Sequence, residues 1–156
     1  MLSNPGLLWV SSLLAAIGLY MLSQAQSPVA AILASTVWGL GVCVMWPTML
    51  ASVAERYPRG GPWAMGLVGS AGALSIYFVL PQLGAMFDEA KIEFAGGPEA
   101  FARLSGDARL AVEDAAASLS FERLALVPLV LLAVFGFIWL RERGKSRAAL
   151  AGEATA

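Results

Sequence analysis

The sequence predicts an all-α integral membrane protein with four transmembrane helices. Of the 156 residues, 58% are hydrophobic and only 13% are charged, and the mean hydropathy is +0.72. A water-soluble domain usually carries about 25% charged residues. The charges are also clustered, because residues 1–54, 60–87 and 124–140 contain no Asp, Glu, Lys or Arg. Charge-free blocks of this length fit the hydrocarbon core of a bilayer.

The lengths of these blocks give the number of crossings. A helix rises about 1.5 Å per residue and the bilayer core is about 30 Å thick, so about 20 apolar residues make one crossing. The first block is long enough for two crossings, which a polar Ser-Gln-Ala-Gln-Ser-Pro stretch separates. The expected helices span about residues 6–22, 29–54, 62–87 and 121–140. The first could instead be a signal peptide, but it lacks a basic start and exceeds the usual apolar length of roughly 7–15 residues.

Basic residues in the short connections predict the orientation in the inner or plasma membrane. The link 55–61 carries Arg56 and Arg59, and the tail 141–156 carries four basic residues in its first seven positions. We therefore expect the link and both termini to face the cytoplasm. The segment 88–123 holds eight acidic and only four basic residues, which places it outside.

The extracytoplasmic segment, residues 88–120, is expected to contain short helical pieces. Residues 88–97 are predicted to form an extended connection that ends in glycine. Pro98 suits the first turn of a short helix reaching Leu104. The alanine-rich stretch 108–120 favours a second helix, which either continues into the last crossing or bends just before it. This helix either rests on the outer leaflet or caps a permeation pathway.

Prolines and glycines inside the predicted spans are candidate hinge and packing positions. Pro47 and Pro81 each leave one carbonyl without its intrahelical N–H, which favours a kink. The kink at Pro47 is either a gating bend or a bend that wraps the helix around a neighbour. Small residues let membrane helices approach closely. The glycines concerned are Gly39, Gly41, Gly66, Gly69 and Gly72.

Neutral polar and aromatic side chains within the spans are the candidates for contact with a solute. On the second span, one face at helical spacing is mixed in polarity. It consists of Ala34, Trp38, Gly41, Met45, Thr48 and Ser52. This face borders an aqueous cavity or, alternatively, its aromatic residues face lipid or the protein core. The substrate-facing candidates are Trp38, Met45, Trp46, Thr48, Tyr77 and Gln82.

The composition argues against catalysis, metal binding and nucleic-acid binding. The chain has no His, one Cys and a net charge of −1. His is the commonest general base and metal ligand, and nucleic-acid binding requires a basic excess. No charged residue lies inside the three blocks 1–54, 60–87 and 124–140, so we expect no ion-coupling residue in the membrane interior. We expect no enzyme activity, no metal, no cofactor and no nucleic-acid partner.

One longer motif resembles permeases of the major facilitator superfamily. Residues 41–50 (GVCVMWPTML) and 55–66 (ERYPRGGPWAMG) are similar to the tenth helix, the cytoplasmic turn and the start of the eleventh helix in bacterial sugar, nucleoside or general solute permeases. Physically, Pro58 blocks continuation of the second span and the following glycines allow the reversal. Within the turn, which comprises Glu55, Arg56, Pro58 and Arg59, we expect Glu55 to pair with Arg59.

The resemblance implies helices nine to twelve of the twelve-helix fold of a secondary active transporter. Such a permease moves a small polar solute by alternating access, and its tenth helix lines the central cavity while the ninth and twelfth lie at the periphery. The partners would be the lipid bilayer, the solute and the missing N-terminal helices, and this fragment would be inactive alone. The alternative is a self-standing four-helix membrane protein that acts as an oligomeric small exporter or as an accessory or structural subunit.

Overall fold

The computed structural model describes residues 3–153, and all of its regular structure is helical. In chain order the helices are α1 (Asn4–Ser23), α2 (Pro28–Arg56), α3 (Gly61–Ala95), α4 (Pro98–Arg103) and α5 (Gly106–Glu153). All except α4 are long and apolar enough to cross a membrane. The prediction of an all-α chain with four apolar helices of membrane-spanning length is therefore confirmed.

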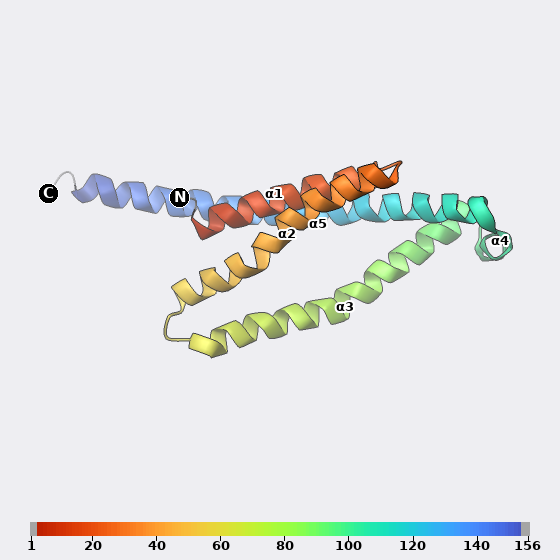
Figure 1. Cartoon of the computed structure of the whole chain (residues 1–156). Helices are drawn as coiled ribbons and strands as arrows, with labels where there is room; N and C mark the ends of the chain where they lie inside the picture. Colours follow the sequence, from red (N-terminus) through yellow and green to blue (C-terminus); the bar gives the residue numbers. More distant parts are fainter. Residues whose placement is uncertain (1–2, 154–156) are drawn as a thin grey trace.

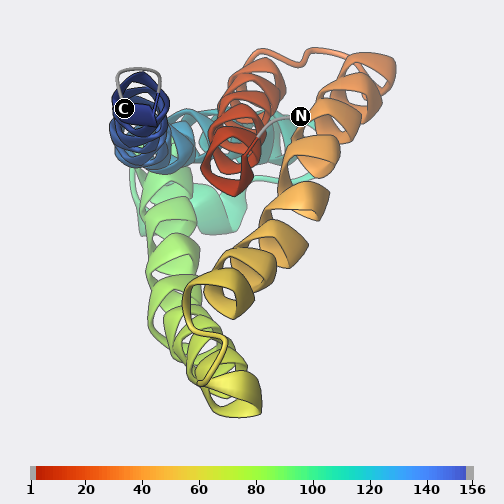
Figure 2. The ribbon, with the colours of Figure 1, turned by 90° about the vertical axis from the view of Figure 1, so that its left-hand side faces the viewer.

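The long helices run back and forth along one common direction (Figure 1). α1 makes its most extensive contacts with α2 and α5, whereas α3 contacts mainly α5. Viewed from the end, α1 lies between α2 and α5, and α2 and α3 lean away together as a hairpin (Figure 2). The start of α1 and the α2–α3 turn lie toward one end, and the α1–α2 link and α4 lie toward the other.

The packed core is built on α1 and consists mostly of small residues. A larger share of α1 is buried than of any other membrane-length helix. The Ser12 hydroxyl is fully buried and donates to the Leu8 carbonyl over 2.9 Å, so its polar group is satisfied within the helix. The other buried residues of α1 include Ser11, Ala15, Ala16 and Leu19. Side chains this small allow neighbouring helices to approach closely.

Aromatic rings join α1 to α5. Trp9 and Trp139 are stacked with their ring centroids 5.8 Å apart. Gly136, one turn before Trp139, leaves room for this arrangement, because a Cβ there would lie 3.0 Å from the Trp9 ring. α1 is thus enclosed on two sides, whereas the resemblance places the corresponding ninth helix at the periphery.

α3 is longer than the sequence predicts. The predicted end at residue 87 and the extended connection 88–97 are wrong, because the helix continues to Ala95. It ends only where Gly96 adopts a left-handed conformation with a φ of 79°. An ion pair of 2.7 Å between Asp88 and Lys91, three residues apart, lies within the additional turns. The sequence contains no Gly or Pro between the apolar span and the glycine pair Gly96–Gly97.

The short helix after α3 forms where the sequence predicts it, with Pro98 in its first turn. A cationic clasp around Phe101, formed by Lys91 of α3 and Arg109 of α5, holds this helix in place. The Lys91 Nζ lies 5.5 Å from the centroid of the Phe101 ring, and the Arg109 Cζ lies 5.1 Å from it. Such cation–π contacts contribute about 0.5–1 kcal/mol each at exposed sites.

α5 is one continuous helix of 48 residues that passes through Pro128. The predicted bounds of the last span, 121–140, are therefore too narrow for the helix as a whole. The segment 108–120 belongs to the same helix, so of the two alternatives the helix continues into the last apolar segment. The tail beyond residue 140 is helical as far as Glu153, and its last residues, 154–156, lie outside the described residues.

Candidate functional site

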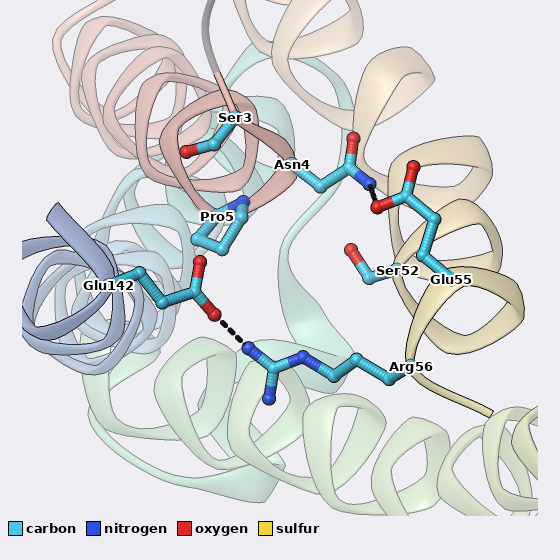
Figure 3. Close-up of a pocket in the computed structure, with 7 residues that line it drawn as sticks. All are labelled: Ser3, Asn4, Pro5, Ser52, Glu55, Arg56 and Glu142. Carbon is cyan, nitrogen blue, oxygen red and sulfur yellow. Dashed lines mark hydrogen bonds and ion pairs between the residues drawn. The ribbon is translucent and has the colours of Figure 1, made fainter. Parts of the chain in front are cut away.

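A polar cavity lies where the start of α1, the end of α2 and the C-terminal half of α5 meet (Figure 3). Its volume is about 420 Å³. Arg56 stands in the last turn of α2, where the negative end of the helix dipole favours a cation. The lining consists of Ser3, Asn4, Pro5, Ser52, Glu55, Arg56 and Glu142.

Two side-chain contacts cross this cavity and join three helices. The Arg56 guanidinium donates to the Glu142 carboxylate, which links α2 to α5. The Asn4 amide donates to the Glu55 carboxylate over 2.7 Å, which links α1 to α2. The predicted pair of Glu55 with Arg59 is not among the ion pairs of the described residues. That prediction is wrong. Glu55 instead accepts a hydrogen bond from Asn4 of α1, which the residues near Glu55 in the sequence do not reveal.

These contacts are reversible on energetic grounds. The side chains of Arg56 and Glu142 are 56% and 39% exposed. An ion pair at such exposure contributes about 0–1 kcal/mol, because water screens both charges. The Arg56–Glu142 link between α2 and α5 is therefore one that thermal motion can break.

The face of α2 that the sequence offers as a solute face packs against α1. A Cβ on Gly41 would lie 2.7 Å from the backbone nitrogen of Ala15. On α1, a Cβ on Gly18 would lie 2.4 Å from the backbone nitrogen of Trp38 of α2. The Thr48 hydroxyl is turned to its own helix and donates to the Val44 carbonyl over 2.6 Å. The buried residues of α2 are Ala34, Gly41 and Thr48.

The remaining substrate-facing candidates do not gather at one place. The ring of Trp46 lies 3.4 Å from the position that a Cβ on Gly72 would take, so this side chain belongs to the α2–α3 contact. Met45 is half-buried on α2. On α3, Tyr77 and Gln82 are both exposed.

Two of the glycines on α3 face open space. A Cβ on Gly66 or Gly69 would meet no other heavy atom within 4 Å outside the adjoining backbone, and the same holds for Gly39 on α2. Pro47 and Pro81 lie exposed in the interiors of their helices. The glycine face of α3 around Gly66 and Gly69 is therefore not covered by the described part of this chain, whereas Gly72 is covered by Trp46.

Sequence reasoning missed Asn4 and Glu142 as members of the polar cavity, and it named Ser52 only as part of the mixed face of the second span. Glu142 carries a usable signal, since it stands alone among the basic residues of 141–147. An acid among basic residues is a candidate for an ion pair, but the sequence does not show that its partner is Arg56 of α2. Asn4 carries no such signal, because its role depends on how close α1 comes to the end of α2.

The described residues contain no group of three or more His, Cys, Asp or Glu side chains placed to hold a metal ion. Comparison with known protein families, curated proteins and solved structures finds no match for this chain. The resemblance to the major facilitator superfamily thus depends on the motif in residues 41–66.

Proposed function

We propose that this chain is the C-terminal portion of a major facilitator superfamily transporter, which moves a small polar solute across the inner or plasma membrane by alternating access. The observation that carries the proposal is the Trp-Pro-Thr-Met element followed by the Glu-Arg-Tyr-Pro turn. In the fold, this motif corresponds to a helix with an internal proline, a tight turn and a glycine-rich helix.

The uncovered glycine face of α3 supports a larger assembly. Gly66 and Gly69 offer a surface at which another helix could approach the backbone, and nothing in the described chain occupies it. Membrane helices pack through such faces because small side chains permit close van der Waals contact. In the proposed transporter, a helix from the N-terminal part covers this face.

The polar cavity supports a role in alternating access. A transporter of this type rocks between states, so the contacts that close one end must break in each cycle. The Arg56–Glu142 and Asn4–Glu55 contacts connect separate helices at one end, and the ion pair is exposed enough to exchange with water. The hairpin of α2 and α3 is the element that these contacts hold against α1 and α5.

A self-standing four-helix membrane protein is the second candidate, and the packed core around α1 favours it. Gly18 and Gly41 bring α1 and α2 into backbone contact, and Trp9 stacks on Trp139 of α5. A chain with this interface has a core of its own. Its function would then be that of an oligomeric small exporter or of an accessory or structural subunit.

The genomic DNA upstream of the Met1 codon tests the first proposal. It should encode about eight further apolar segments, in frame or after a frameshift, because the fold has twelve helices. Upstream DNA without such segments would contradict the proposal.

A transport assay separates the two candidates. The joined gene and this chain alone should be expressed at equal membrane levels, and uptake of radiolabelled sugars and nucleosides should be measured. Uptake by the joined protein only would support the transporter portion. Saturable uptake by vesicles that contain this chain alone would support the self-standing exporter.

A further inference from the structure

An apolar groove lies along the α2–α3 turn, next to the polar cavity, with which it shares Arg56. Its volume is about 660 Å³. Val53 at the end of α2 and Leu67 and Val68 in the second turn of α3 contribute apolar surface to it. A groove of this size is within the range of about 300–1,000 Å³ that small-molecule sites occupy.

The groove lies where we expect the membrane–water interface. The turn separates two blocks without charged residues, 1–54 and 60–87. Two aromatic residues, Tyr57 and Trp63, line the groove and are 63% and 79% exposed. Tyr and Trp are enriched at headgroup level, where one part of the ring is apolar and another can reach water. The groove therefore reaches from the headgroup layer into the hydrocarbon.

The charge of the groove is positive. Its lining contains Arg56 and Arg59 and no acidic residue, and because the Arg56 guanidinium is paired with Glu142, Arg59 is the cation available to a ligand. Arg59 is exposed and takes part in none of the ion pairs found among residues 3–143. A guanidinium presents several N–H donors in a geometry that matches a phosphate group. Basic pockets next to membrane helices bind the headgroups of anionic lipids.

We propose that this groove binds one anionic glycerophospholipid. The acyl chains lie on the apolar surface of Leu67 and Val68, and the phosphate lies against Arg59. A lipid with a neutral headgroup fits the apolar surface equally well, but its ammonium group offsets the phosphate charge. Arg59 therefore determines which headgroup the groove prefers. The proposal depends only on the α2–α3 turn and is independent of the transporter function.

Native mass spectrometry of the full chain in detergent tests the proposal. Equal amounts of dioleoyl phosphatidylglycerol and dioleoyl phosphatidylcholine compete for the protein, and the ratio of the two adducts is measured. A juxtamembrane arginine strengthens anionic-lipid binding about fivefold. Arg59→Gln should therefore lower the phosphatidylglycerol preference about fivefold. Arg103→Gln removes the same charge from α4, where the side chain is 82% exposed, and should leave the preference unchanged.

A second measurement locates the bound lipid and does not depend on the arginine variants. In vesicles, brominated phosphatidylglycerol quenches nearby tryptophans, and Trp63→Phe should remove most of the excess quenching over brominated phosphatidylcholine. Equal adducts of the two lipids on the wild-type chain would overturn the proposal. So would an equal loss of preference in Arg59→Gln and Arg103→Gln, or excess quenching that persists in Trp63→Phe.

Discussion

Replacing Gly18 with alanine tests whether α1 and α2 pack through backbone contact. A Cβ at Gly18 would lie 2.4 Å from the nitrogen, 2.5 Å from the Cα and 2.6 Å from the Cβ of Trp38. Carbon atoms in favourable contact lie about 3.5–4.0 Å apart, so the helices would have to separate by about 1 Å. Because two of the contacted atoms belong to the backbone, no side-chain rotation can remove the overlap.

The expected loss follows from two opposing effects. Overpacking of a close contact costs about 1–3 kcal/mol, whereas alanine is about 0.5–1 kcal/mol more favourable than glycine inside a helix. Gly18→Ala should therefore destabilise the α1–α2 contact by about 1–2 kcal/mol. Gly39→Ala is the matched control, because a Cβ there meets no other heavy atom within 4 Å outside the adjoining backbone. This control should be neutral or stabilising by up to about 1 kcal/mol.

The assay is unfolding of the purified chain in mixed micelles with an increasing fraction of sodium dodecyl sulfate. Tryptophan fluorescence reports the transition, since Trp38 is itself the neighbour of Gly18. The midpoint should shift to less dodecyl sulfate for Gly18→Ala and stay or rise for Gly39→Ala. Equal midpoints for the two variants would refute the close-packing argument.

Three further predictions concern topology, the outer connection and gating. Gly60→Cys and Gly97→Cys, each in a Cys43→Ala background, should react with an impermeant maleimide from opposite sides, with Gly60→Cys labelled from the cytoplasm because basic residues flank it. Phe101→Ala should speed amide hydrogen exchange in α4 about fivefold or more, because it removes the ring of the cationic clasp. In the proposed transporter, Pro47→Ala should slow turnover while equilibrium solute binding stays within a few-fold, since the change affects interconversion more than contact.

Each of these predictions has an outcome that contradicts it. Labelling of Gly60→Cys and Gly97→Cys from the same side would be incompatible with the arrangement of α2 and α3. Phe94→Ala is the control, because it removes a half-exposed ring of α3 that has no part in the clasp. If amide exchange in α4 were as fast in Phe94→Ala as in Phe101→Ala, the clasp would not be what stabilises α4. Unchanged turnover of Pro47→Ala, at equal protein levels in the membrane, would exclude the gating role.

The apolar helices were predictable because a single strong physical constraint determines them. Charged residues are too costly in hydrocarbon, so their absence from residues 1–54, 60–87 and 124–140 marks the spans directly. The start of α4 was equally predictable, since Pro98 lacks the N–H that the first helical turn leaves unused. Each of these signals is local in the sequence.

The end of α3 and the role of the α2 face depend on information that is not local. A helix does not have to end where it leaves the hydrocarbon core. Residues 88–95 therefore continue α3, because no residue before Gly96 favours another backbone conformation. Helical spacing shows that Trp38, Gly41 and Thr48 share a face, but it does not show what covers that face. Here the cover is α1, whose small residues accept the backbone of α2.

α5 can act as a lever because it is one continuous helix. At about 1.5 Å per residue, its 48 residues form a rod of roughly 72 Å, more than twice the thickness of the hydrocarbon core. A tilt of about 5° around the middle of such a rod displaces each end by about 3 Å in opposite directions. A movement that starts at the clasp around Phe101 is thereby carried to Glu142, which lies roughly 19 Å from the middle of the rod and moves by about 1.6 Å, enough to lengthen its ion pair with Arg56. The clasp around Phe101 and the polar cavity are mechanically connected through one helix.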